Sequence, residues 1–176
     1  MKSETVENLI TYHHNWFDHS DSRHPRVRTS TVHVYNNYYD GCAKYGIGAT
    51  SGCSIFAEAN YFRGTKRPMM SSLQGTDAQG DGTFSSEPGG MIKSFNNVFA
   101  EKSSKFSYIT HEDNATSFDA YEAKSREEQV PSSYKTLQGN TTYSNFDTSS
   151  SMYKYTADAP ENIPSIVTGF LGAGRL

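Results

Sequence analysis

One pattern of apolar, polar and aromatic positions recurs four times in the first hundred residues. It reads ITYHHNWF, VHVYNNYY, IFAEANYF and IKSFNNVF. Its central asparagines are Asn15, Asn37, Asn60 and Asn97, which lie 22, 23 and 37 residues apart. A repeat of this length is typical of solenoids, in which each repeat packs only against its neighbours. Because the repeat is rich in β-branched residues and poor in leucine, it predicts an all-β solenoid, a parallel β-helix.

The register of the repeat predicts three columns of equivalent side chains. Successive coils of a parallel β-helix stack about 4.8 Å apart, so equivalent residues lie above one another. The predicted internal aliphatic column consists of Ile10, Val32, Ile55 and Ile92. The predicted aromatic stack consists of Phe17, Tyr39, Phe62 and Phe99. The asparagine side chains would form hydrogen bonds from one amide to the next and with the backbone groups of the turns. The alternative interpretation is four unrelated hairpins with asparagine turns.

Two segments outside the repeat are predicted to lie on the surface. Residues 66–90 lengthen the third interval and are rich in Gly, Ser and Asp, as in a surface loop. In solenoids such insertions commonly cluster on the binding face. Ala120–Gln129 (AYEAKSREEQ) predicts a short helix that ends before Pro131.

The C-terminal sequence NIPSIVTGFLGAGRL predicts a short segment that packs on the outside of the solenoid. Its apolar residues are Ile163, Ile166, Val167, Phe170 and Leu171. Because no linker is visible, we expect one domain over residues 1–176. Its coils would occupy about 7–110 and its C-terminal packing segment about 111–176.

Composition narrows the class of protein further. Sixteen Lys and Arg against 19 Asp and Glu give a net charge of −3, so we expect no binding to nucleic acid or to a membrane surface. No run approaches the roughly 18–20 apolar residues of a membrane helix. Aromatic residues make up 13% of the chain, which is too many for a disordered protein. The many Ser and Thr residues favour polar ligands, and sugars above all.

Neither the cysteines nor the histidines predict a metal site. Cys42 and Cys53 match no zinc pattern, and they either pair in an oxidising compartment or remain two buried thiols. His13 and His14 are adjacent, and adjacent residues of a strand point to opposite faces. We therefore expect these two side chains to pack rather than to share a metal ion.

Three arginines surround Pro25 in the segment SRHPRVR, between the first two repeats. In an extended strand the odd separation of Arg23 and Arg28 would place them on opposite faces, but Pro25 and a bend can bring both to one side. Clustered guanidinium groups suit a carboxylate, because the planar fork binds two oxygens at once. An anionic sugar is therefore a candidate ligand, and a solvated basic turn paired with nearby aspartates is the alternative.

The order and spacing of several motifs resemble one family. ITYHHNWF, SRHPRVR, VHVYNNYYDG and EANYF follow one another as in the family 1 polysaccharide lyases, the pectate lyases. The resemblance runs from about Glu7 to Phe62 and resumes at the C-terminal SIVTGFLGAGRL. It implies a right-handed single-stranded parallel β-helix and the cleavage of α-1,4-linked polygalacturonate by β-elimination.

The resemblance also implies roles for two of the arginines. In the family's Arg-x-Pro-x-x-Arg motif, the first arginine is the base that removes the C5 proton and the last binds the substrate carboxylate. These positions are Arg23, the implied catalytic residue, and Arg28, the implied substrate-binding residue, whereas Arg26 inherits no role. Ca²⁺ is the implied cofactor, because a hard cation stabilises the negative charge that develops at the carboxyl group.

Part of the family's site has no counterpart in these residues. The family's Ca²⁺-binding carboxylates lie upstream of the HHN segment, so no metal ligands can be identified here. The chain resembles the C-terminal half of a pectate lyase, a β-helix without its N-terminal coils. Because open β edges associate, we expect self-association or a partner chain at the open N-terminal coil. The resemblance also implies a secreted protein.

Two alternatives to a Ca²⁺-dependent pectate lyase stay open at this point. A non-catalytic polyuronate-binding β-helix would keep the arginine clamp and lack the calcium site. A pectin lyase, which acts on methyl esters, would work without Ca²⁺ in an aromatic-lined cleft, although Trp16 is the only tryptophan. Ultraviolet absorbance of the unsaturated product, with and without Ca²⁺, separates the three.

Overall fold

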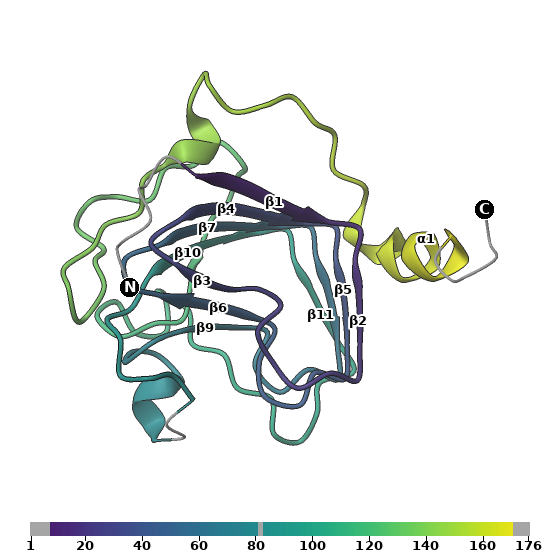
Figure 1. Ribbon diagram of the computed structural model, residues 1–176, viewed down its shortest axis with the longest axis horizontal. Coiled ribbons are helices and arrows are strands. Elements are labelled where there is room, and N and C mark those ends of the chain that lie inside the picture. Colours follow the sequence, from purple (N-terminus) through teal and green to yellow (C-terminus); the bar gives the residue numbers. More distant parts are fainter. Residues whose placement is uncertain (1–7, 81–82, 171–176) are drawn as a thin grey trace.

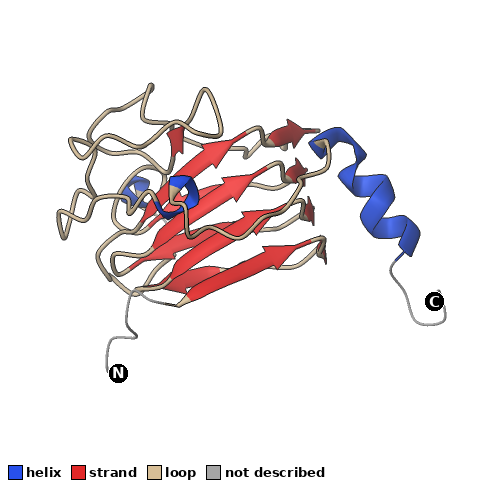
Figure 2. Ribbon diagram, turned by 90° about the horizontal axis from the view of Figure 1, so that it is seen from above, coloured by secondary structure: helices blue, strands red, loops and turns tan. Residues whose placement is uncertain are grey.

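The computed structural model of the chain describes residues 8–80 and 83–170. The strands lie in three parallel sheets that enclose one core (Figure 1). The chain visits the three sheets in a fixed order, so that its strands form the coils of a parallel β-helix. Figure 2 shows the successive strands of one sheet stacked side by side. The predicted all-β solenoid is confirmed.

Each sheet collects the equivalent strands of successive coils. In spatial order, the five-stranded sheet contains β1 (Leu9–His13), β4 (Thr31–Tyr35), β7 (Ser54–Glu58), β10 (Met91–Phe95) and β12 (Tyr121–Glu122). The four-stranded sheet contains β11 (Val98–Ala100), β8 (Tyr61–Arg63), β5 (Tyr38–Asp40) and β2 (Trp16–Asp18). The three-stranded sheet contains β3 (Arg26–Arg28), β6 (Ile47–Thr50) and β9 (Met69–Ser71).

The aliphatic and aromatic columns lie in the predicted register. Ile10 pairs with Val32, Val32 with Ile55, and Ile55 with Ile92. In the four-stranded sheet the ring centroids of the aromatic stack are 5.0, 4.4 and 5.5 Å apart from one coil to the next. Aromatic and β-branched side chains fill the space between parallel strands well, which is why they recur at these two positions.

The asparagine column forms a continuous hydrogen-bonded ladder. Asn15 Nδ2 donates to Asn37 Oδ1 at 2.9 Å, Asn37 Nδ2 to Asn60 Oδ1 at 3.1 Å, and Asn60 Nδ2 to Asn97 Oδ1 at 2.9 Å. The residue before each ladder asparagine has a left-handed backbone, with φ between 50° and 54°. This conformation turns the chain from the five-stranded to the four-stranded sheet, and the amide groups bind the backbone groups that the turn frees.

Replacing Asn37 with alanine is expected to lower the free energy of unfolding by about 2–4 kcal/mol, because several buried partners lose their hydrogen bonds at once. Its Nδ2 also donates to the carbonyls of Tyr12 and Tyr35, each at 3.0 Å. Denaturant unfolding measures the loss. The matched control is Asn15→Ala at the exposed end of the ladder, where water can replace the amide; equal losses at both positions would contradict the expectation.

The predicted helix over Ala120–Gln129 is wrong. Tyr121 and Glu122 form β12, which extends the five-stranded sheet beside β10. The Glu128 carboxylate then accepts from the Tyr121 hydroxyl and from the Lys124 backbone N–H, each at 2.6 Å. These contacts fold the segment into turns and bury Tyr121 beside Met91, which an exposed helix would not do.

The surface loop predicted for residues 66–90 is only partly correct. The segment begins with β9, whose three residues are fully buried in the three-stranded sheet. It continues through a short 3-10 helix, η1 (Asp77–Gln79). Phe84, farther along, is 7% exposed and packs against Tyr45. The insertion therefore covers part of the sheet, because it carries its own apolar anchor.

The C-terminal segment crosses the outside of the β-helix. It contains η2 (Phe146–Thr148), η3 (Pro160–Asn162) and α1 (Ile163–Phe170), which lies beside β2 and β5 (Figure 1). Ile163 and Val167 of α1 pack against Tyr38, which confirms the predicted outside packing, whereas Leu171 lies outside the described residues. None of the helices in the described ranges is long and apolar enough to cross a membrane.

Candidate functional site

Two of the three arginines project from one face because of strand periodicity. Val27 lies between Arg26 and Arg28 on β3, and it points into the core. Arg26 and Arg28 therefore lie together on the outer face of the three-stranded sheet. Arg23 lies in the turn before β3, with a left-handed backbone (φ 73°) and an exposed side chain.

The charges of all three arginines act on the hydroxyl of Tyr45. Burial raises the pKa of Tyr45, and the charges of Arg23, Arg26 and Arg28 oppose this rise. Arg26 and Arg28 thus share one face of β3, and Arg23 lies in the turn that precedes them. Tyr45 Oη and Arg26 Nε are buried and have no hydrogen-bond partner in the described residues.

A carboxylate from the insertion lies inside this arginine cluster. Glu87 accepts hydrogen bonds from Arg28 Nε at 2.8 and 2.9 Å and from Arg26 Nη2 at 3.0 Å. The Arg26 guanidinium also lies over the ring of Phe84, 5.1 Å from its centroid. Hydrogen bonds between charged groups are stronger than those between neutral groups, and here they hold a carboxylate between two arginines.

The three arginines differ in how accessible they are. The side chain of Arg26 is 7% exposed; its Nη2 donates to Glu87 and its guanidinium lies over Phe84. The side chain of Arg28 is 40% exposed. Arg23 makes one hydrogen bond, to Ser22 Oγ at 3.4 Å, and no ion pair within the described residues. Arg23 and Arg28 can therefore reach a ligand outside the sheet, and Arg26 supports the cluster from below.

The described residues beside the arginines do not fit Ca²⁺. This ion takes six to eight oxygen ligands, usually with several carboxylates among them. Glu87 is held by two arginines, and Asp21 is paired with Lys44 Nζ at 3.0 Å. Within residues 8–80 and 83–170, no set of free carboxylates adjoins the cluster.

A separate group of possible metal ligands lies at the end of the four-stranded sheet. Side-chain atoms of Asp18, His19 and Asp40 lie within 4.8 Å of one another. A hydrogen bond from His19 Nδ1 to the Asp18 carboxylate raises the pKa of His19, and Asp40 is paired with Arg63 Nε at 3.0 Å. An imidazole with two carboxylates suits a transition metal better than Ca²⁺, but the Asp40 carboxylate is already paired with Arg63.

The prediction that the side chains of His13 and His14 point to opposite faces of a strand is wrong. His14 lies beyond the end of β1, and its left-handed backbone (φ 54°) turns its ring back toward the strand. The two Nδ1 atoms are 2.9 Å apart, and His14 Nε2 lies 2.9 Å from Asp158 Oδ2.

The two cysteines are free, buried thiols, which is one of the two interpretations that the sequence left open. Burial raises the pKa of Cys53 to about 12.

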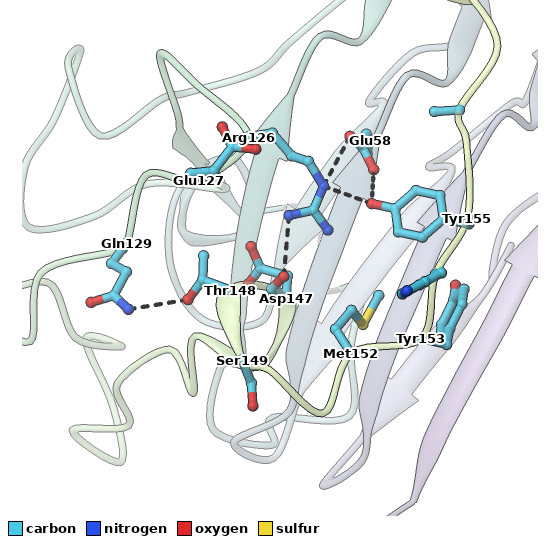
Figure 3. A pocket seen from close by; sticks show the side chains of 12 residues that line it. Glu58, Arg126, Glu127, Gln129, Asp147, Thr148, Ser149, Met152, Tyr153 and Tyr155 are labelled. Atoms are coloured by element: carbon cyan, nitrogen blue, oxygen red, sulfur yellow. Dashed lines mark hydrogen bonds and ion pairs between the residues drawn. The ribbon is translucent and has the colours of Figure 1, made fainter.

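A recess of about 780 Å³ lies on another part of the molecule, between the five-stranded sheet and the C-terminal segment (Figure 3). Its centre holds Glu58, Arg126 and Tyr155. The Tyr155 hydroxyl donates to Glu58 Oε2, and Arg126 Nε donates to the Tyr155 hydroxyl at 2.9 Å. His33, which is fully buried, also contacts Glu58 Oε2, at 3.3 Å. Because these polar groups are hydrogen-bonded to one another, they hold the C-terminal segment against the five-stranded sheet.

Sequence reasoning missed Glu87, Tyr45 and the pairing of Asp18 with Asp40. The last was available from the repeat, because both aspartates stand three positions after a ladder asparagine. Tyr45 and Glu87 carried no such signal. They belong to the irregular segments between strands, whose positions depend on packing rather than on the repeat.

Comparisons with known proteins agree with this architecture. A family model described as pectate lyase matches residues 2–166. A pectate trisaccharide-lyase from Bacillus licheniformis is 39% identical over 69 residues, which are 39% of this chain and 20% of the relative. Pectate lyase B from Dickeya chrysanthemi is 35% identical over 75 residues, 43% of this chain and 20% of the relative. The matches span about a fifth of the length of these relatives.

Solved structures resemble the fold along nearly the whole chain. A pectate lyase from Paenibacillus sp. 0602 aligns with a TM-score of 0.61 and 20% identity, over 99% of this chain and 40% of that one. A pectate lyase from Bacillus sp. N165, in complex with trigalacturonate, aligns with a TM-score of 0.54 and 21% identity, over 94% and 40%. This likeness agrees with the predicted right-handed β-helix. The family model, which matches nearly the whole chain, shows that the chain belongs to the pectate lyase family.

Proposed function

We propose that this chain carries the arginine part of a lyase site that cleaves α-1,4-linked polygalacturonate by β-elimination. The observation that carries the proposal is the arginine cluster on the three-stranded sheet, where a carboxylate is already bound between Arg26 and Arg28. Each sugar of the polymer presents the same group. Membership of the pectate lyase family supports the reaction type.

In the proposed reaction the Arg23 side chain, in its neutral guanidine form, takes the proton from C5 of a galacturonate unit. The electron pair of that C–H bond forms the C4–C5 double bond while the bond between C4 and the bridging oxygen breaks. The departing oxygen takes a proton from water, and the hydroxide that remains takes the proton from Arg23, which restores the neutral base. Arg28 pairs with the carboxylate attached to C5, so that its charge opposes the negative charge that grows there in the transition state.

A requirement for Ca²⁺ is part of the proposal only through the family resemblance. When bound, the ion would supply positive charge at the substrate carboxylate. The described residues beside the arginines do not fit it, so no step above passes through the ion. The proposal also includes secretion, because polygalacturonate is a polymer that meets its enzymes outside the cell.

The experiment that tests the function measures unsaturated product by ultraviolet absorbance on polygalacturonate, with Ca²⁺ and with a chelator. We expect a rise with Ca²⁺ and a much smaller one with the chelator. A rise under both conditions, and on methyl-esterified pectin, would favour the pectin lyase alternative. Binding of trigalacturonate without any rise would favour a non-catalytic polyuronate-binding β-helix.

We also propose that the uncovered edge of the first coil associates, with a second copy of this chain or with a partner chain. Ile10 is 39% exposed although it belongs to the internal column, whereas Val32 directly above it is 1% exposed. Within the described residues, β1, β2 and β3 each have a strand on one side only. Uncovered edges of this kind favour association.

Light scattering over a range of concentrations measures this association. Self-association predicts a mass that rises with concentration, and Ile10→Asp should lower it, whereas Leu137→Asp, at a leucine that is 52% exposed beside Gln74, should not. If the mass stays constant alone and also after mixing with the N-terminal half of a family member, the proposed association is wrong.

A further inference from the structure

The position of Glu87 in the arginine cluster depends on a contact across the fold. Glu87 lies 59 residues after Arg28 in the sequence, on the insertion that follows β9. Backbone hydrogen bonds fasten the neighbouring residues to the sheet: Ser51 N donates to Pro88 O at 2.6 Å and Gly52 N to Gly89 O at 2.9 Å. The Ser72 hydroxyl donates to the Glu87 carbonyl at 2.7 Å. The carboxylate is therefore held in place by its own backbone.

Glu87 uses only one edge of the Arg28 guanidinium. Both of its carboxylate oxygens accept from Nε, at 2.8 and 2.9 Å. In the described part of the chain, no hydrogen bond reaches the two terminal nitrogens of Arg28, and its side chain is 40% exposed. The edge formed by these two nitrogens is the one that binds a second carboxylate with two parallel hydrogen bonds.

Arg26 completes the arrangement from beneath the surface. Its Nη2 donates to Glu87 Oε2 at 3.0 Å, and its side chain is 7% exposed. Its buried guanidinium has Glu87 as an ion-pair partner, so Arg26 helps to hold the Glu87 carboxylate in place. From the core to the surface the order is therefore Arg26, Glu87 and Arg28. Arg28, the outermost of the three, is the one whose terminal nitrogens have no hydrogen bond in the described residues.

We propose that Glu87 is a positioning residue for substrate binding: it fixes the plane of the Arg28 guanidinium and leaves its terminal edge open to the carboxylate of a sugar unit. The inference rests on the proposed function and adds the residue that orients its carboxylate-binding arginine. An arginine free to rotate would lose side-chain entropy on binding, and Glu87 removes that cost in advance.

Glu87→Gln tests the proposal, because it keeps the shape of the side chain and removes its charge. We expect kcat/KM on polygalacturonate to fall about tenfold, mostly through a higher KM, since Arg28 is displaced rather than lost. Glu87→Asp, which keeps the charge, should recover part of the loss. The matched control is Glu101→Gln, which removes an exposed carboxylate 3.6 Å from Arg63 on another sheet and should change neither constant.

A second measurement follows Arg28 itself. The Nε–H signal of Arg28 in a ¹⁵N-edited NMR spectrum, assigned with Arg28→Lys, should exchange slowly with water in the wild type and quickly in Glu87→Gln. An unchanged or lower KM in Glu87→Gln would overturn the proposal, and the lower value would make Glu87 a competitor of the substrate. Fast exchange in the wild type would overturn it as well. A wild type without lyase activity or trigalacturonate binding would instead refute the proposed function, with the exchange rates still deciding whether Glu87 holds Arg28.

Discussion

Arg23→Ala is expected to lower the turnover of polygalacturonate by about 10²–10⁴-fold, the usual contribution of a positioned base. The fold should be unaffected, because the Arg23 side chain is exposed and its one hydrogen bond reaches Ser22. The rate of unsaturated product formation measures the first effect, and thermal unfolding followed by circular dichroism measures the second.

The control for this substitution removes a different exposed cation from the next coil. Lys44 is paired with Asp21 at 3.0 Å and is well exposed, so Lys44→Ala changes the net charge equally without removing the proposed base. It should keep most of the activity. If Arg23→Ala unfolds the protein, or if it turns over substrate at the rate of Lys44→Ala, the assignment of Arg23 to the chemistry is wrong.

The second large effect concerns a buried ion pair under the C-terminal segment. Lys93 Nζ lies 2.7 Å from Asp147 Oδ2, and both side chains are completely buried. The same nitrogen donates to the carbonyl of Arg126 at 2.7 Å. Lys93→Met is expected to lower the free energy of unfolding by about 3–5 kcal/mol, because it leaves the Asp147 charge buried without its partner. Denaturant unfolding at neutral pH measures the loss.

The double variant Lys93→Met/Asp147→Leu separates the charge effect from the packing effect. Removing both charges should recover most of the loss, because no unpaired ion remains in the interior. Recovery should be incomplete, since the Tyr143 hydroxyl loses the Asp147 oxygen to which it donates at 2.8 Å. Losses that simply add would show that the two charges do not stabilise each other.

The repeat was sufficient to predict most of the fold. A parallel β-helix places equivalent residues in contact, so the pattern that predicted Ile10, Phe17 and Asn15 as members of columns also predicted their partners. These features depend on neighbours in sequence and on the spacing of coils, both of which are visible in the chain.

The errors arose where local pattern and tertiary packing disagree. Ala120–Gln129 has the composition of a helix, but the free edge of β10 and the apolar cluster around Met91 draw Tyr121 into the sheet. Burial of an aromatic side chain stabilises more than the helix propensity of a few residues. The side chains of His13 and His14 were predicted to point apart because adjacent residues of a strand do so, but β1 ends at His13.

The sequence by itself determined the stacked coils, the three columns and the motif that holds Arg23 and Arg28, because each is written as a repeat or a local spacing. Only the tertiary structure decided that Glu87 holds Arg28 and that Lys93 meets Asp147. These pairs are 59 and 54 residues apart and belong to no repeat. Their formation depends on where the insertion and the C-terminal segment fold back, which is set by the burial of Phe84, Met91 and Tyr143 rather than by any local pattern.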